Sequence, residues 1–123
     1  MDNLIVAADI LKNKLAVHAR GITPMAVKRK LDQDEDFILL DVRSPAEHAE
    51  VSIEGAKLIP LGILREKLDS LPKDKEIVVV CRTGHRSAQG RDILRQAGFT
   101  NVTSMAGGVT EWQNQGLAIA TGP

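Results

Sequence analysis

Chemically reactive side chains gather in one short stretch of the sequence, Cys81–Ser87, which reads Cys-Arg-Thr-Gly-His-Arg-Ser. An apolar run predicted to be a strand leads into it, and an amphipathic helix is predicted to follow. A loop with a glycine can turn backbone N–H groups toward one point, and the amino end of a helix adds positive potential there. Arg82 and Arg86 add full charges, and His85 adds charge when protonated. The thiol of Cys81 is therefore predicted to have a lowered pKa and to be largely thiolate near neutral pH.

A plainer interpretation treats Cys81 as a small buried hydrophobe that ends a strand, as free cysteines often do. The arginines and the glycine beside it favour the reactive interpretation. Two neighbouring residues also have an alternative interpretation without a role in the chemistry. Arg82 is then a charge that faces solvent, and His85 is an ordinary loop residue.

The composition excludes several other functions. The chain has 123 residues, 43% of them hydrophobic and 26% charged, and a formal net charge of zero, so we expect one domain that binds neither nucleic acid nor membranes. One cysteine forbids an intrachain disulfide, and with three scattered histidines it gives no zinc-ligand spacing. We expect no metal and no cofactor. The N-terminus lacks the pattern of a signal peptide, and the cysteine usage suits a reducing compartment, so the cytoplasm is predicted.

Helical and strand patterns alternate along most of the chain. Strands are predicted at 37–42, 57–60, 77–80 and 101–105. One helix is predicted to begin at Thr23-Pro24 and another after Ser44. Further helices are predicted over the apolar stripe 63–71, from about Arg86 or Ser87 to 97, and at 110–115. This alternation predicts an α/β domain with a largely parallel sheet. The domain is expected to span residues 21–120.

Residues 1–20 precede this pattern and are predicted to form an N-terminal extension. Apolar residues recur there at helical spacing, at Leu4, Ala8, Leu11 and Leu15. An amphipathic helix over about 3–17 is therefore predicted, which docks on the domain, binds a protein partner or is the tail of a removed larger protein.

Polar or glycine-containing segments follow three of the predicted strands, at Asp41–Arg43, Cys81–Arg86 and Gly107-Gly108. Ligands of parallel α/β sheets bind beyond the carboxyl ends of the strands. We therefore expect these three segments to lie near one another.

The length of the cysteine loop separates two chemistries that a thiolate in a basic loop could perform. Cysteine-dependent phosphatases place five residues between cysteine and arginine, to enclose a tetrahedral oxyanion. Here four residues separate Cys81 from Arg86, and Ser87 stands where that arginine would be needed. The shorter loop favours holding one terminal sulfur as a persulfide over holding a phosphate or an arsenate.

The stretch Cys81–Ser87 resembles the active-site loop of rhodanese-type single-domain sulfurtransferases. The resemblance covers about residues 22–118 and includes Asp41–Glu47, Ile53–Leu61 and Gly107–Trp112 in the expected order. It implies a three-layer α/β/α domain with a mostly parallel five-stranded sheet and a persulfide intermediate on Cys81. It also implies that Asp41 and Arg43 lie near the loop and help to position it. Where the family commonly has Gly-His, this chain has Val51-Ser52, a change expected to affect only a surface turn.

The resemblance implies a sulfurtransferase with two half-reactions. Cys81 attacks the outer sulfur of a small anionic donor such as thiosulfate, and the N–H groups of Arg82, Thr83, Gly84, His85 and Arg86 hold the persulfide. The two arginines are expected to attract the donor, and Ser87 to support the loop. Without a second cysteine, the acceptor must be external: cyanide, a small thiol or a protein thiol.

Two other classes stay open. A cysteine-dependent phosphatase or arsenate reductase is opposed by the serine at position 87. A regulatory or binding module that uses residues 1–20 to reach a partner is opposed by the intact cysteine and arginine loop.

Overall fold

A computed structural model describes residues 21–122 of the chain. The helix predicted over 3–17, and the partner binding predicted for residues 1–20, fall outside the described residues and stay predictions. The described elements are α2 (Pro24–Asp32), β1 (Phe37–Asp41), α3 (Pro45–Glu50), β2 (Lys57–Leu58), the 3-10 helix η1 (Leu61–Ser70), β3 (Glu76–Val80), α4 (His85–Gln96), β4 (Val102–Ser104) and α5 (Gly108–Asn114).

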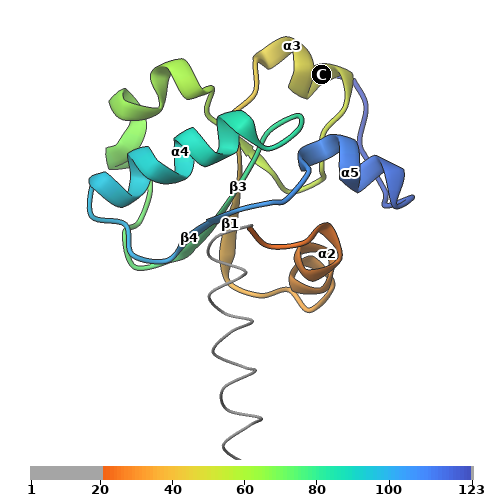
Figure 1. Cartoon of the computed structure of the whole chain (residues 1–123), viewed down its shortest axis with the longest axis horizontal. Helices are drawn as coiled ribbons and strands as arrows, with labels where there is room; N and C mark the ends of the chain where they lie inside the picture. Colours follow the sequence, from red (N-terminus) through yellow and green to blue (C-terminus); the bar gives the residue numbers. More distant parts are fainter. Residues whose placement is uncertain (1–20, 123) are drawn as a thin grey trace, which may run out of the picture.

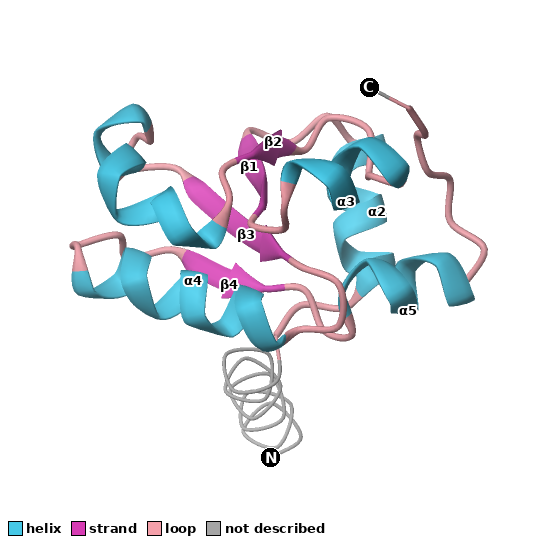
Figure 2. Cartoon of the chain, turned by 90° about the horizontal axis from the view of Figure 1, so that it is seen from above, coloured by secondary structure: helices cyan, strands magenta, loops and turns pink. Residues whose placement is uncertain are grey.

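The strands form one parallel sheet in the order β2-β1-β3-β4; Figure 1 labels β1, β3 and β4, and Figure 2 labels all four strands. β1 and β3 are its long central members, and their apolar runs suit strands that are covered on both faces. Beyond β4, Ile22 makes a single parallel bridge to Met105. The backbone N–H of Ile22 donates to Ser104 (2.8 Å), and its carbonyl accepts from Ala106 (2.8 Å). The described chain thus has four strands, and a single residue occupies the place of the fifth strand that the resemblance implies.

Helices cover both faces of the sheet, as Figure 2 shows from above. On one face α4 and η1 close a core that includes Leu64, Leu94 and Phe99. On the other face α2 and α5 close a second core around Val27 and Trp112. The predicted three-layer α/β/α architecture is therefore confirmed.

Local sequence signals fix where several helices begin and end. The Thr23 hydroxyl caps α2, where it accepts from Ala26 N–H. Ser44 and Glu47 form a reciprocal capping box at the start of α3. Gly98, at φ +98°, closes α4, because Phe99 N–H donates to the Leu94 carbonyl, which is the bond of a Schellman motif.

Two predicted segments differ in detail from the structure. The apolar stripe at 63–71 forms a 3-10 helix that begins at Leu61, and Leu64 is its fully buried residue. α4 begins at His85, one residue earlier than predicted. Among residues 21–122, no helix has the length and apolar character needed to span a bilayer.

Candidate active site around Cys81

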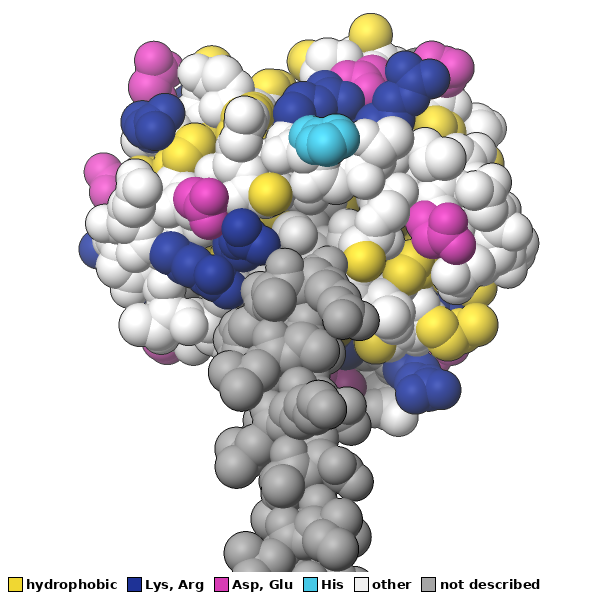
Figure 3. Space-filling view, in the orientation of Figure 1, with side chains coloured by type: hydrophobic (Ala, Val, Ile, Leu, Met, Phe, Trp, Pro, Cys, Tyr) yellow, Lys and Arg dark blue, Asp and Glu magenta, His cyan; other side chains and the backbone are white. Residues whose placement is uncertain are grey.

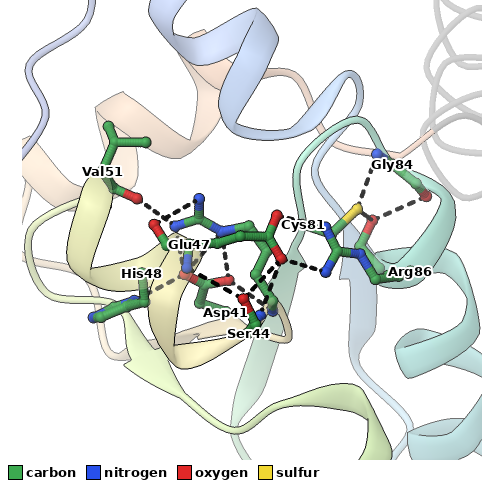
Figure 4. Close-up of polar contacts among 10 residues, drawn as sticks. Asp41, Ser44, Glu47, His48, Val51, Cys81, Gly84 and Arg86 are labelled. Carbon is green, nitrogen blue, oxygen red and sulfur yellow. Dashed lines mark hydrogen bonds and ion pairs between the residues drawn. The ribbon is translucent and has the colours of Figure 1, made fainter.

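Cys81 follows β3 directly, and the loop to α4 curls around its sulfur (Figure 4). The backbone N–H of Gly84 donates to Sγ at 2.9 Å, and the Ser87 hydroxyl lies 3.5 Å from Sγ. The same hydroxyl lies 3.0 Å from the Gly84 carbonyl, so its one proton serves either this oxygen or the sulfur at a given moment. Gly84 has φ +119°, a conformation that glycine adopts without strain. Of the donors predicted at residues 82–86, Gly84 makes this hydrogen bond to the sulfur, and Ser87 lies beside the sulfur.

The environment of the Cys81 thiol contains two opposing influences on its pKa. Burial would raise the pKa, since Cys81 is only 1% exposed. The Ser87 hydroxyl and the backbone N–H groups of Ser87, Gly84 and Thr83 favour the thiolate and outweigh burial, so the pKa lies below its ordinary value. The loop therefore favours a nucleophilic form of the sulfur.

The amino end of α5 holds the first part of the loop in place. Val109 N–H donates to the Cys81 carbonyl (2.8 Å), and Thr110 N–H donates to the Arg82 carbonyl (3.0 Å). A Cβ on Gly108 would stand 2.5 Å from each of these carbonyl oxygens, so only glycine permits this approach. The sequence predicts that Gly107-Gly108 lies near the cysteine loop, and in the structure the two segments contact each other through their backbones.

Arg86 pairs with Glu47 of α3 through two short hydrogen bonds of 2.6 and 2.8 Å. These hydrogen bonds are the main cause of the lowered pKa of Glu47, which is about 2. The acidic partner also explains how a cation is tolerated in the first turn of α4. We expected Arg86 to attract an anionic donor, but Glu47 already neutralises its charge. In the sequence, Glu47 ends the Ser-Pro-Ala-Glu pattern of a capping box, and nothing local indicates this second role.

Asp41 and Arg43 form a buried pair below α3. Arg43 donates to the Asp41 carboxylate through Nε (3.0 Å) and a terminal nitrogen (2.8 Å), and also to the Val51 carbonyl (2.6 Å). His48 Nδ1 lies 2.9 Å from the same carboxylate, a contact that was not predicted. Burial would raise the pKa of Asp41, but these hydrogen bonds outweigh it and lower the pKa. The pair holds the carboxyl end of α3, the helix that carries Glu47, through the Glu47 and Val51 carbonyls.

The remaining predicted residues, Arg82, Thr83 and His85, are exposed. Figure 3 shows basic side chains and a histidine gathered over the loop between β3 and α4 and over α3. Arg82 has no carboxylate partner among residues 21–122, unlike Arg86. It lies at the edge of a pocket of about 370 Å³ between α3 and α5.

No group of three His, Cys, Asp or Glu side chains within residues 21–122 is arranged to hold a metal ion.

Comparison with known proteins agrees with this geometry. Residues 23–115 match the Rhodanese-like domain family. A sulfurtransferase of Allochromatium vinosum is 35% identical over 76% of this chain and 88% of its own length. The putative sulfurtransferase YtwF of Bacillus subtilis is 39% identical over 78% of this chain and 92% of its own length.

The fold has a close structural counterpart as well. The crystal structure of a rhodanese-like domain protein from Staphylococcus aureus superposes with a TM-score of 0.71 at 34% identity, over 81% of this chain and 97% of that protein. The match to the family covers most of the chain and includes the cysteine loop, the Gly107-Gly108 contact and the Asp41–Glu47 segment. The chain belongs to the rhodanese-like domain family.

Proposed function

We propose that this protein is a sulfurtransferase that carries sulfane sulfur on Cys81, with thiosulfate or a similar small anion as donor. The observation that carries the proposal is the Cys81 sulfur in a cradle of backbone N–H groups that lowers its pKa. The relatives named as sulfurtransferases support the same chemistry.

In the first half-reaction the Cys81 thiolate attacks the outer sulfur of thiosulfate. The new Cys81 S–S bond forms as the donor's S–S bond breaks, and sulfite leaves with the electron pair. The terminal sulfur of the persulfide then carries the negative charge. The N–H groups of residues 82–86 and the amino end of α4 stabilise that charge.

In the second half-reaction an external acceptor takes the terminal sulfur, and Cys81 leaves as thiolate. The acceptor must come from outside because the chain has no second cysteine. Cyanide, a small thiol and a protein thiol are each nucleophilic enough. A thiolate that must stay reduced between cycles favours a reducing compartment, and we propose the cytoplasm.

The two arginines of the loop receive different roles in this proposal. Arg82 is the cation that attracts the donor, because no carboxylate among residues 21–122 neutralises it. Arg86 is a positioning residue, held by Glu47, which fixes the first turn of α4 around the sulfur. Thr83 N–H favours the thiolate, and we propose that His85 N–H also faces the terminal sulfur of the persulfide.

Intact-mass measurement tests the persulfide without assuming an acceptor. After incubation with thiosulfate and removal of the excess, the wild-type chain should gain the mass of one sulfur atom, and cyanide should then remove it as thiocyanate. Cys81→Ser is the matched control and should show neither signal. If the wild-type chain gains no sulfur and forms no thiocyanate, the proposal is wrong. Hydrolysis of an aryl phosphate would instead support the phosphatase class.

A further inference from the structure

The segment that follows α5 returns to α3 and forms hydrogen bonds at the carboxyl end of that helix (Figure 1). We call this segment, residues 117–122, the tail. Ser52 and Ala120 exchange two backbone hydrogen bonds, of 2.9 and 2.8 Å. The N–H of Gly122 donates to the Ala49 carbonyl at 2.7 Å. The tail is therefore bonded both to the last turn of α3 and to the strand-like residue that follows the helix.

The other end of the tail is fixed to α5. The Trp112 indole N–H donates to the Ala118 carbonyl at 2.9 Å, and the N–H of Leu117 donates to the Trp112 carbonyl at 3.2 Å. Trp112 is buried in the core that α2 and α5 close, and Leu117 packs against that core. Residues of the tail also line the pocket between α3 and α5, which Glu50 lines as well. The tail thus connects a firmly anchored helix to α3.

α3 depends on such contacts because it has no hydrophobic anchor of its own. None of its six residues is buried, and the structure describes all of them. By contrast, α2 buries Val27, and α5 buries Val109 and Trp112. Burial of an apolar face is what stabilises most helices on a domain. Hydrogen bonds, such as those from Arg43 and from the tail, therefore hold the carboxyl end of α3 in place.

The position of α3 matters because the helix carries Glu47. Glu47 holds Arg86 through hydrogen bonds of 2.6 and 2.8 Å. Arg86 and Ser87 lie in the first turn of α4, and the Ser87 hydroxyl lies 3.5 Å from the Cys81 sulfur. A hydrogen bond weakens steeply as its partners leave alignment. A small displacement of α3 therefore loosens the turn that borders the sulfur.

We propose that the tail is a positioning element for sulfur transfer, which holds α3 so that Glu47 keeps Arg86 in place beside Cys81. This inference rests on the proposed function, because its kinetic effect is on the formation of the Cys81 persulfide. The match to the family ends at residue 115, so the match assigns the tail no such role. The tail acts through Glu47 and takes no part in making or breaking bonds to sulfur.

Two proline substitutions in the full chain isolate the link between the tail and α3. Ala120→Pro removes the N–H that donates to Ser52. Thr121→Pro is the matched control, because it introduces the same residue at the next position and removes no hydrogen bond found within residues 21–122. It also favours the extended conformation that Ala120 already has. Both positions lie outside the buried cores, so both variants should fold, which circular dichroism checks.

The rate constant for loading Cys81 with sulfur from thiosulfate, followed by intact mass, is measured for each proline variant alone and combined with Glu47→Gln. We expect Glu47→Gln to slow loading about tenfold. Ala120→Pro should slow it about threefold to fivefold, a smaller effect because Arg43 still holds α3. Thr121→Pro should load at the wild-type rate. Because the tail acts through Glu47, Ala120→Pro should slow the Glu47→Gln chain by less than about 1.5-fold.

The dependence of loading on thiosulfate concentration separates positioning from donor binding. The slowing in Ala120→Pro should appear in the maximal rate at saturating thiosulfate. The concentration that gives half of this rate should stay within about 1.5-fold of the wild-type value. The reason is that Arg82, which attracts the donor, has its carbonyl anchored to α5 and not to α3.

Urea unfolding gives a second measurement that needs no activity. If the tail keeps Glu47 and Arg86 paired, Glu47→Gln has less to lose once the link to α3 is cut. The fall in the urea midpoint caused by Glu47→Gln should therefore be smaller in the Ala120→Pro chain than in the wild type or in the Thr121→Pro chain.

The outcomes separate this inference from the proposed function. If Ala120→Pro loads at the wild-type rate, or if both prolines slow loading equally, the tail is not a positioning element. The inference is also wrong if the effects of Ala120→Pro and Glu47→Gln simply multiply, or if the urea midpoints show no coupling. If the wild type takes up no sulfur while the urea midpoints show the expected coupling, the proposed function fails and the link between the tail and Glu47 stands.

Discussion

Replacing Glu47 with glutamine should separate the support of the cysteine loop from its chemistry. Glutamine keeps the shape of the side chain and an oxygen for the Ser44 cap, but removes the charge that faces Arg86. The perturbation is therefore confined to the ion pair between α3 and α4.

The size of the effect follows from the pKa of Glu47. It is lowered from 4.5 to about 2, a difference that corresponds to about 3 kcal/mol. The side chain of Arg86 is 36% exposed and that of Glu47 is 25% exposed, so solvent screens the pair. We therefore expect Glu47→Gln to lower the free energy of unfolding at neutral pH by about 1–2 kcal/mol.

The pH dependence of the free energy of unfolding tests the same ion pair. Because the pKa of Glu47 is lower in the folded chain than in the unfolded chain, its contribution is complete above about pH 4.5 and is lost as the pH falls toward 2. The gap in stability between the wild type and Glu47→Gln should therefore narrow across that interval.

Urea unfolding followed by tryptophan fluorescence measures this gap. Trp112 is the single tryptophan and is 2% exposed, so its emission should report global unfolding. Glu66→Gln, which removes an exposed carboxylate outside this network, should change the stability by less than about 0.5 kcal/mol. Equal stabilities of wild type and Glu47→Gln at pH 7, or a gap that stays constant down to pH 3, would refute the reasoning.

Two further predictions concern the loop itself. Ser87→Ala should raise the pKa of Cys81 toward its ordinary value, because the hydroxyl favours the thiolate. The ultraviolet absorbance of the thiolate, followed against pH, measures this pKa. An unchanged midpoint of that titration would contradict the prediction. Arg82→Gln should raise the KM for thiosulfate about threefold to tenfold at low salt, and should weaken the increase of KM with ionic strength. If Arg82→Gln leaves the KM and its salt dependence unchanged, another group recruits the donor.

Much of the fold follows from short-range sequence signals. The caps at Thr23 and Ser44 and the Schellman closure at Gly98 each depend on residues that are close together in the chain. The cradle around Cys81 also depends on residues that are close together in the chain, because its donors follow the cysteine within six residues.

The contacts that escaped prediction join distant parts of the chain. Glu47 and Arg86 are 39 residues apart, and their pairing depends on how α3 lies against the amino end of α4. The pocket that contains Glu50 likewise depends on a tail that returns to pair with Ser52. No periodicity or cap carries this information, since it arises only when the sheet brings the elements together.

The junction between α5 and the cysteine loop has a consequence for changing specificity. Val109 and Thr110 anchor the Cys81 and Arg82 carbonyls through their main-chain N–H groups, and both residues line the neighbouring pocket. The side chain of Val109 belongs to the buried core, whereas Thr110 is exposed. Substitution at Thr110 can therefore reshape the wall of the pocket while its main chain keeps the sulfur cradle in place, so long as Gly108 is left alone. The fold thus separates the main-chain contacts that hold the sulfur cradle from the side chain that can vary with the bound molecule.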